Sequence, residues 1–178
     1  MSDHDPDPTT LVRAVLKDGF SRIEEGVRRV VDGLGAEDLS WAPEGATNSV
    51  GWLLWHLCRQ QDAQLSSIAW EEVVWTAQGW VDRFDLPYGR EEMGYGQDEA
   101  EVRAFRVVDP GLLTGYARAV HDRSVRLVEG LGAQDYYRVI DTSWDPPVTV
   151  GVRVYSVLED SAKHLGQAEY LRGMLDRR

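Results

Sequence analysis

The sequence has 178 residues, of which 43% are hydrophobic and 28% are charged. This composition is ordinary for a soluble globular protein, and the length allows one domain with a sizeable core. The formal net charge of -11 argues against nucleic-acid binding, which depends on Lys and Arg. We therefore expect a single domain over residues 1–178, with residues 1–7 as a flexible tail.

Two further classes of protein are disfavoured by short features of the chain. No apolar run approaches the roughly 20 residues of a membrane-spanning helix, and the acidic start lacks the parts of a secretory signal. Cys58 is the only cysteine, which excludes an intrachain disulfide and a cysteine-based zinc cluster. We expect a cytoplasmic protein with no membrane or nucleic-acid partner, in which any metal site uses histidine and carboxylate ligands.

The first half of the chain contains two predicted helices. Residues 8–34 carry apolar side chains at three- and four-residue steps, which is the pattern of an amphipathic helix, and glycines then supply a stop signal. A second helix is predicted from residue 50 to about residue 70, after a run of good N-cap residues at 47–49. This second helix is apolar on several sides at its start, which predicts deep burial.

The second half contains two more predicted helices. One covers about residues 110–131, where the initial proline suits a first helical turn. The other covers residues 150–175 and follows a proline pair, with Thr149 as its N-cap. The four segments together predict an all-α fold, an antiparallel four-helix bundle.

A long connection separates the second and third predicted helices. Residues 71–109 are rich in Trp, Gly and charge, and we expect short helices near 71–80 and 101–108. Between them we expect a loop at 86–89 and a turn at 93–96. A connection of this length is uncommon in a compact domain unless it serves a function, such as covering a site.

The two halves of the sequence resemble each other. Residues 30–38 parallel residues 127–135, and each segment spans the end of one long helix and the following loop. This match favours an internal duplication, with two helix pairs related by rough symmetry. Bundles of this kind commonly build metal sites from side chains on facing helices.

Three residues of the second and fourth helices could carry chemistry. Asp160 and His164 are four residues apart and share one helix face, although an ordinary surface pair has the same spacing. His56 lies in an apolar stretch, where its ring nitrogens need a partner, either a backbone carbonyl or a metal. If the two helices face each other, two imidazoles and one carboxylate form a three-ligand set with a vacant position, which is a catalytic pattern. These ligand types suit zinc, nickel or iron.

Other polar residues are weaker candidates for the site. Glu159 is a competing carboxylate, but its spacing favours an ion pair with Lys163. Gln60 lies one turn after the histidine of the second helix and Asp62 lies further on; either could hold a ligand or a water, or lie on a solvated face. Cys58 is interpreted as a small buried hydrophobic residue.

These segments resemble a known family. Residues 48–57 resemble the second-helix motif of the DinB-like superfamily, in its actinobacterial mycothiol-transferase-like branch. Residues 159–167 are similar to the fourth-helix motif, in which a ligand, three residues, a histidine, one residue and a glycine follow in order. Residues 94–96 and 102–106 resemble the connecting region, so the resemblance covers nearly the whole chain.

The resemblance implies a divalent metal ion held by His56, Asp160 and His164. Asp160 stands where many relatives have histidine and others have an acidic residue, and a shorter acidic side chain can change the preferred metal. Zinc is the first choice, with nickel or iron as alternatives. Family members with known activity use a low-molecular-weight thiol, mycothiol or bacillithiol, and a coordinated thiol is deprotonated.

The resemblance therefore implies a metal-dependent thiol S-transferase. Its partners would be mycothiol and a small electrophile. Gln60 and Asp62 are the only nearby candidates for acid–base assistance. A homodimer is also expected. Two alternatives stay open at this point: a non-catalytic, stress-associated metal-binding bundle, and a structural oligomerising bundle whose histidines are satisfied core residues. Bound metal would distinguish the structural bundle from the other two hypotheses. Thiol affinity would then distinguish the transferase from the non-catalytic metal-binding bundle.

Overall fold

The computed structural model describes residues 7–44 and 48–178. The predicted flexible tail therefore lies outside the described residues except for its last member, Asp7. That residue caps the first helix, because its side chain accepts a hydrogen bond from the backbone N–H of Thr9. Thr47, the first of the three predicted capping residues of the second helix, also lies outside the described residues.

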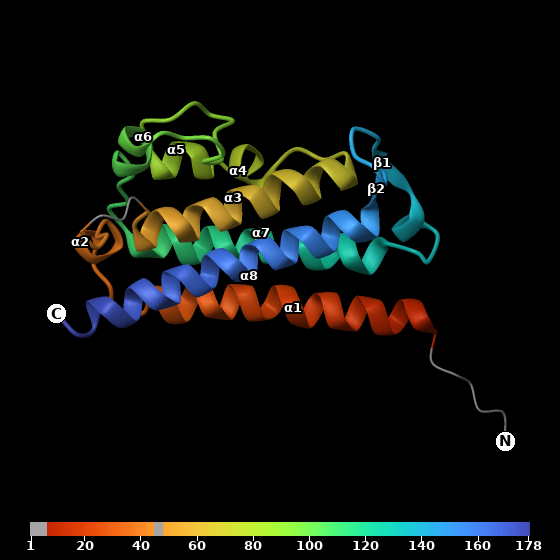
Figure 1. Ribbon diagram of the computed structural model, residues 1–178, viewed down its shortest axis with the longest axis horizontal. Coiled ribbons are helices and arrows are strands. Elements are labelled where there is room, and N and C mark those ends of the chain that lie inside the picture. Colours follow the sequence, from red (N-terminus) through yellow and green to blue (C-terminus); the bar gives the residue numbers. More distant parts are fainter. Residues whose placement is uncertain (1–6, 45–47) are drawn as a thin grey trace, which may run out of the picture.

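Four long helices form the body of the described chain (Figure 1). They are α1 (Pro8–Val31), α3 (Val50–Ala69), α7 (Pro110–Gly130) and α8 (Val150–Leu175). Their bounds differ from the predicted ones by only a few residues, so the predicted all-α fold is confirmed. No helix in the described ranges is both long enough and apolar enough to cross a membrane.

The helices run in two opposite directions. Figure 1 shows α1 and α8 running one way and α3 and α7 running the other, so the neighbouring pairs α3–α8 and α1–α7 are antiparallel. The parallel pair α1–α8 packs in register, because Gly19 lies against Leu158 and Gly26 lies against Leu165. Since α3 and α7 are parallel, the chain must return along the bundle between them, and this accounts for the long connection.

The connection is built from short helices and loops. Its helices are α4 (Val74–Ala77), α5 (Trp80–Phe84) and α6 (Glu99–Arg103). The single helix expected at 71–80 is thus replaced by two, because Gly79 between them adopts a left-handed conformation with φ of +68°. The helix expected at 101–108 begins and ends earlier than predicted.

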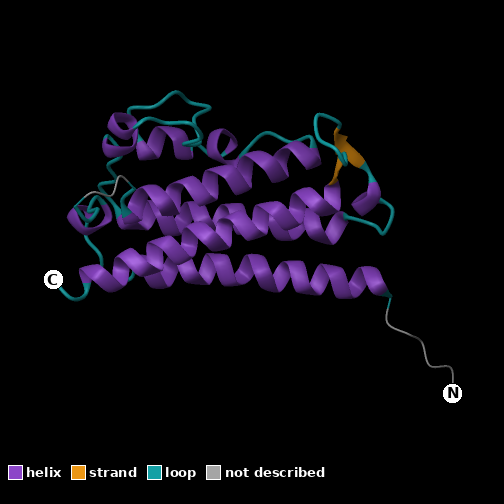
Figure 2. Ribbon diagram, viewed as in Figure 1, coloured by secondary structure: helices purple, strands orange, loops and turns teal. Residues whose placement is uncertain are grey.

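Small elements close the two ends of the bundle. They are α2 (Ala36–Leu39) after α1, and after α7 the 3-10 helix η1 (Asp135–Tyr137) with a two-stranded antiparallel sheet, β1 (Val139–Asp141) and β2 (Val148–Thr149). The strands, orange in Figure 2, were not predicted, because two or three residues give too short a pattern to recognise. Thr149 caps α8 as predicted, since its hydroxyl accepts from the N–H of Val152.

The repeated segments share one local hydrogen bond. The N–H of Gly35 donates to the carboxylate of Asp38, and the N–H of Gly132 donates to the carboxylate of Asp135. Each bond closes the loop after a long helix at the equivalent position of the repeat. This agreement supports the proposed duplication.

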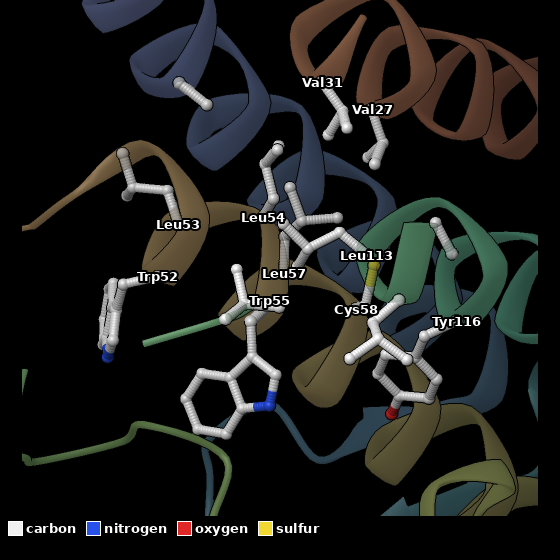
Figure 3. Close-up of a cluster of buried hydrophobic side chains, with 14 of the residues drawn as sticks. Val27, Val31, Trp52, Leu53, Leu54, Trp55, Leu57, Cys58, Leu113 and Tyr116 are labelled. Carbon is white, nitrogen blue, oxygen red and sulfur yellow. The ribbon is translucent and has the colours of Figure 1, made fainter. Parts of the chain in front are cut away.

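The start of α3 is the centre of the core. Figure 3 shows its apolar side chains in one cluster with Val27 and Val31 of α1 and Leu113 and Tyr116 of α7. Trp55 is fully buried, as the sequence pattern predicts. The cluster holds α3 rigidly, and therefore fixes the direction in which the polar residues of α3 point.

Cys58 belongs to this core, as predicted, with only 3% of its surface exposed. Burial raises the pKa of its thiol, and the thiolate is the reactive form. We expect a thiol-reactive chromogenic disulfide to label Cys58 rapidly in denaturant but only slowly in the native protein. Rapid, stoichiometric labelling of the native protein would contradict the buried position.

Candidate metal centre

The three predicted ligands lie at one pocket between α3 and α8. The pocket has a volume of about 480 Å³, and its lining includes His56, Gln60, Met93, Glu159, Asp160 and His164. The ring centroids of His56 and His164 are 4.8 Å apart, with the ring planes at 84°. The structure therefore brings together residues that lie far apart in the sequence.

The distance between two of the predicted ligands is slightly longer than in a formed metal site. His164 Nε2 lies 3.7 Å from Asp160 Oδ1, and two ligands of a tetrahedral zinc ion lie roughly 3.4 Å apart. Among residues 7–44 and 48–178, no three His, Cys, Asp or Glu side chains are already arranged to hold a metal ion. Coordination would therefore require side-chain shifts from this arrangement.

The hydrogen bonds of the two histidines are compatible with metal binding. His56 Nδ1 lies 2.5 Å from the Met93 carbonyl oxygen, and His164 Nδ1 lies 3.0 Å from Gln167 Oε1. Because a backbone carbonyl only accepts, the neutral His56 ring carries its proton on Nδ1 and leaves the Nε2 lone pair available. Metal-binding histidines characteristically donate their second ring N–H in this way.

Burial also keeps His56 in the form that binds a metal. Desolvation lowers the pKa of His56, and the neighbouring His164 adds to this effect, while the Met93 carbonyl and Asp160 oppose it. The ring also stacks on Trp52, with centroids 4.8 Å apart and planes at 11°. Two imidazoles and a carboxylate fit a divalent metal, and with no thiolate among them they suit zinc, nickel or iron.

Gln60 lies at the pocket, as predicted, and it is buried. Its amide donates to Ser161 Oγ at 3.0 Å, and its carbonyl oxygen accepts from Gln64 Nε2 at 2.6 Å. Gln60 therefore links α3 to α8 just beside the ligands. Both of its polar groups are engaged in these bonds.

The structure does not bring Asp62 to the pocket, which corrects the expectation from sequence. Six residues along a helix leave two side chains roughly 120° apart, so Asp62 points away from the ligands. Its carboxylate accepts from the N–H groups of Val74 and Trp75, at 2.8 and 2.9 Å, and from the Tyr116 hydroxyl at 2.8 Å. Asp62 thus ties the connection to the bundle.

Glu159 also lines the pocket, but it pairs with Lys163 as predicted. Two elements were missed by the sequence reasoning: the Met93 carbonyl and the buried Arg59. A backbone carbonyl leaves no signal in a sequence. The polar run at 59–62 inside an otherwise apolar helix was the signal that could have indicated a buried network.

The comparisons with known proteins agree with the fold. Residues 15–177 match the model of a family described as Mycothiol-S-transferase. The chain is also similar to a solved structure, the "conserved protein of locus from Enterococcus faecalis", with a TM-score of 0.88 and 26% identity over 94% of this chain and 98% of that one. No curated protein matches. The chain belongs to the mycothiol S-transferase family, within the DinB-like superfamily.

Proposed function

We propose that this protein is a metal-dependent thiol S-transferase in which His56, Asp160 and His164 hold one divalent metal ion, zinc being the first choice. The observation that carries the proposal is the pairing of the two imidazoles at one pocket, each with Nδ1 beside an oxygen, and with the Asp160 carboxylate next to His164. Mycothiol is the proposed cosubstrate, on the basis of the family. The acceptor is a small electrophile.

The residues of the pocket have different roles in the proposed reaction. Two imidazoles and one carboxylate would leave one position of a tetrahedral ion for the thiol, and a bound metal would favour the thiolate form. The Met93 carbonyl holds His56 in the required tautomer, and the Gln167 side chain contacts Nδ1 of His164. The pocket of about 480 Å³ then provides space beside the thiol for the electrophile.

Metal content tests the ligand set directly. We expect near-stoichiometric zinc, nickel or iron in the purified wild-type protein by elemental mass spectrometry, and its loss in the His56→Ala, His164→Ala double variant. His121→Ala is the matched control, because this histidine of α7 bonds Ser21 and Asp122 instead. Metal-free wild-type protein after reconstitution, or metal retained in the double variant, would contradict the proposed site.

A thiol-transfer assay then tests the reaction. The metal-loaded protein should consume mycothiol together with a chlorinated fluorogenic electrophile, and the double variant should not. Metal binding without any thiol binding would instead support the alternative, a non-catalytic metal-binding bundle. The homodimer expected from the resemblance stays a prediction, which sedimentation analysis can check.

A further inference from the structure

The carbonyl that orients His56 belongs to a loop packed over α3. Within this loop, the Glu92 carboxylate accepts from the N–H groups of Met93 and Gly94, at 2.8 and 2.7 Å. These bonds shape the turn, so that the Met93 carbonyl can accept from His56. They do not determine where the turn lies relative to α3.

Arg59 connects this loop to α3. Its guanidinium donates from Nε to the Glu92 carbonyl at 3.0 Å and from Nη2 to the Glu91 carbonyl at 3.3 Å. The side chain lies beneath the loop with only 1% of the residue exposed, and its guanidinium lies 5.0 Å from the centre of the Trp75 ring. An arginine is almost never buried to this extent unless it is paired.

The charge of Arg59 is balanced by Asp62, whose carboxylate lies 3.7 Å from Nη1. Balancing this carboxylate alone would require only a cation, and a lysine could supply one. The planar fork of arginine can also donate to two neighbouring carbonyls at once, which the single ammonium of lysine cannot match in geometry. The bonds to the loop are therefore the part of the arrangement that is specific to arginine.

We propose that Arg59 is a positioning residue for His56: it holds the carbonyls of Glu91 and Glu92, and thereby fixes the Met93 carbonyl that sets the orientation and tautomer of the imidazole. Arg59 lies on the same helix as His56, three residues further on. Helix α3 thus carries His56 and, through Arg59, also holds the loop that orients it. The consequence for metal affinity rests on the proposed function, whereas the consequence for the tautomer does not.

The test compares Arg59→Lys with Tyr116→Phe. The Tyr116 hydroxyl belongs to the same buried network, at 2.8 Å from Asp62 and 3.4 Å from Arg59, but no bond joins it to the loop. Tyr116→Phe therefore disturbs the network, but Arg59 still donates to the carbonyls of Glu91 and Glu92. We expect Arg59→Lys to weaken metal binding roughly 10–100-fold, measured by competition with a chromogenic chelator, and Tyr116→Phe to cause no comparable loss.

Nitrogen NMR of the His56 ring in metal-free protein supplies the second measurement. Wild type and Tyr116→Phe should show the Nδ1–H tautomer, and Arg59→Lys should show a mixture of tautomers. Unchanged tautomer and unchanged metal affinity in folded Arg59→Lys would overturn the proposal. If the wild-type protein bound no metal, the proposed function would fail, and the tautomer alone would decide the role of Arg59.

A second pair of variants covers the case in which Arg59→Lys does not fold. Asp62→Asn removes the buried negative charge, and Arg59→Met added to it removes every donor while keeping an apolar side chain over Trp75. The double variant should lose the Nδ1–H tautomer relative to Asp62→Asn alone. Identical ring spectra in these two proteins would overturn the proposal.

Discussion

Asp62→Ala is expected to lower the free energy of unfolding by about 3–5 kcal/mol, the usual result of breaking a buried ion pair from one side. Asp62 is 1% exposed, and its removal leaves Arg59 without a counter-charge. It also leaves the N–H groups of Val74 and Trp75 without the acceptor that they use here. Urea denaturation followed by circular dichroism measures the change.

Asp82→Ala is the control for this prediction. Asp82 also pairs with an arginine, Arg90, at 2.6 Å, but both side chains are more than half exposed. Exposed ion pairs contribute little to stability, so the denaturation midpoint should hardly move. Equal midpoints for Asp62→Ala and Asp82→Ala would show that the Asp62 network does not hold the connection in place.

Gly94→Ala is expected to reduce metal affinity roughly 10–100-fold if the protein binds metal as proposed. A Cβ at Gly94 would lie 2.7 Å from His56 Nδ1, 3.0 Å from Trp52 and 3.2 Å from Trp55. The two tryptophans and the histidine belong to the rigid start of α3, so the loop must move instead. Its movement carries the Met93 carbonyl away from the imidazole.

Gly96→Ala separates this steric effect from backbone strain. Both glycines have positive φ, +90° at Gly94 and +76° at Gly96, so alanine is strained at either position by about 1–3 kcal/mol. A Cβ at Gly96 would meet nothing within 4 Å. Chelator competition should therefore give near-wild-type affinity for Gly96→Ala. Equal losses in the two variants would assign the effect to strain in the loop.

Much of the fold could be predicted from the sequence, because long amphipathic helices repeat their signal many times. The bounds of α1, α3, α7 and α8 follow from apolar periodicity together with capping residues. The strands β1 and β2 have no such repetition, and they form only because η1 and α8 bring the two segments together. Local patterns thus predict long elements and miss those that depend on distant contacts.

The candidate site could be predicted only in part, for the same reason. The spacing of Asp160 and His164 on one helix is a local property, and the structure places both beside His56. What Asp62 bonds to depended on a partner from another helix, Tyr116, and on the connection. Sequence spacing alone left Asp62 as a candidate for catalysis, and the long-range hydrogen bonds assign it to stability.

The separation of α3 from α8 in the chain has a consequence for protein synthesis. Gln60 and Ser161, which join the two helices beside the proposed ligands, are 101 residues apart. A growing chain therefore exposes His56 on the ribosome long before Asp160 and His164 exist, and contacts of such long range form late in folding. Metal capture would then coincide with the docking of α8, and mass action would favour the nascent chains in which that helix has docked.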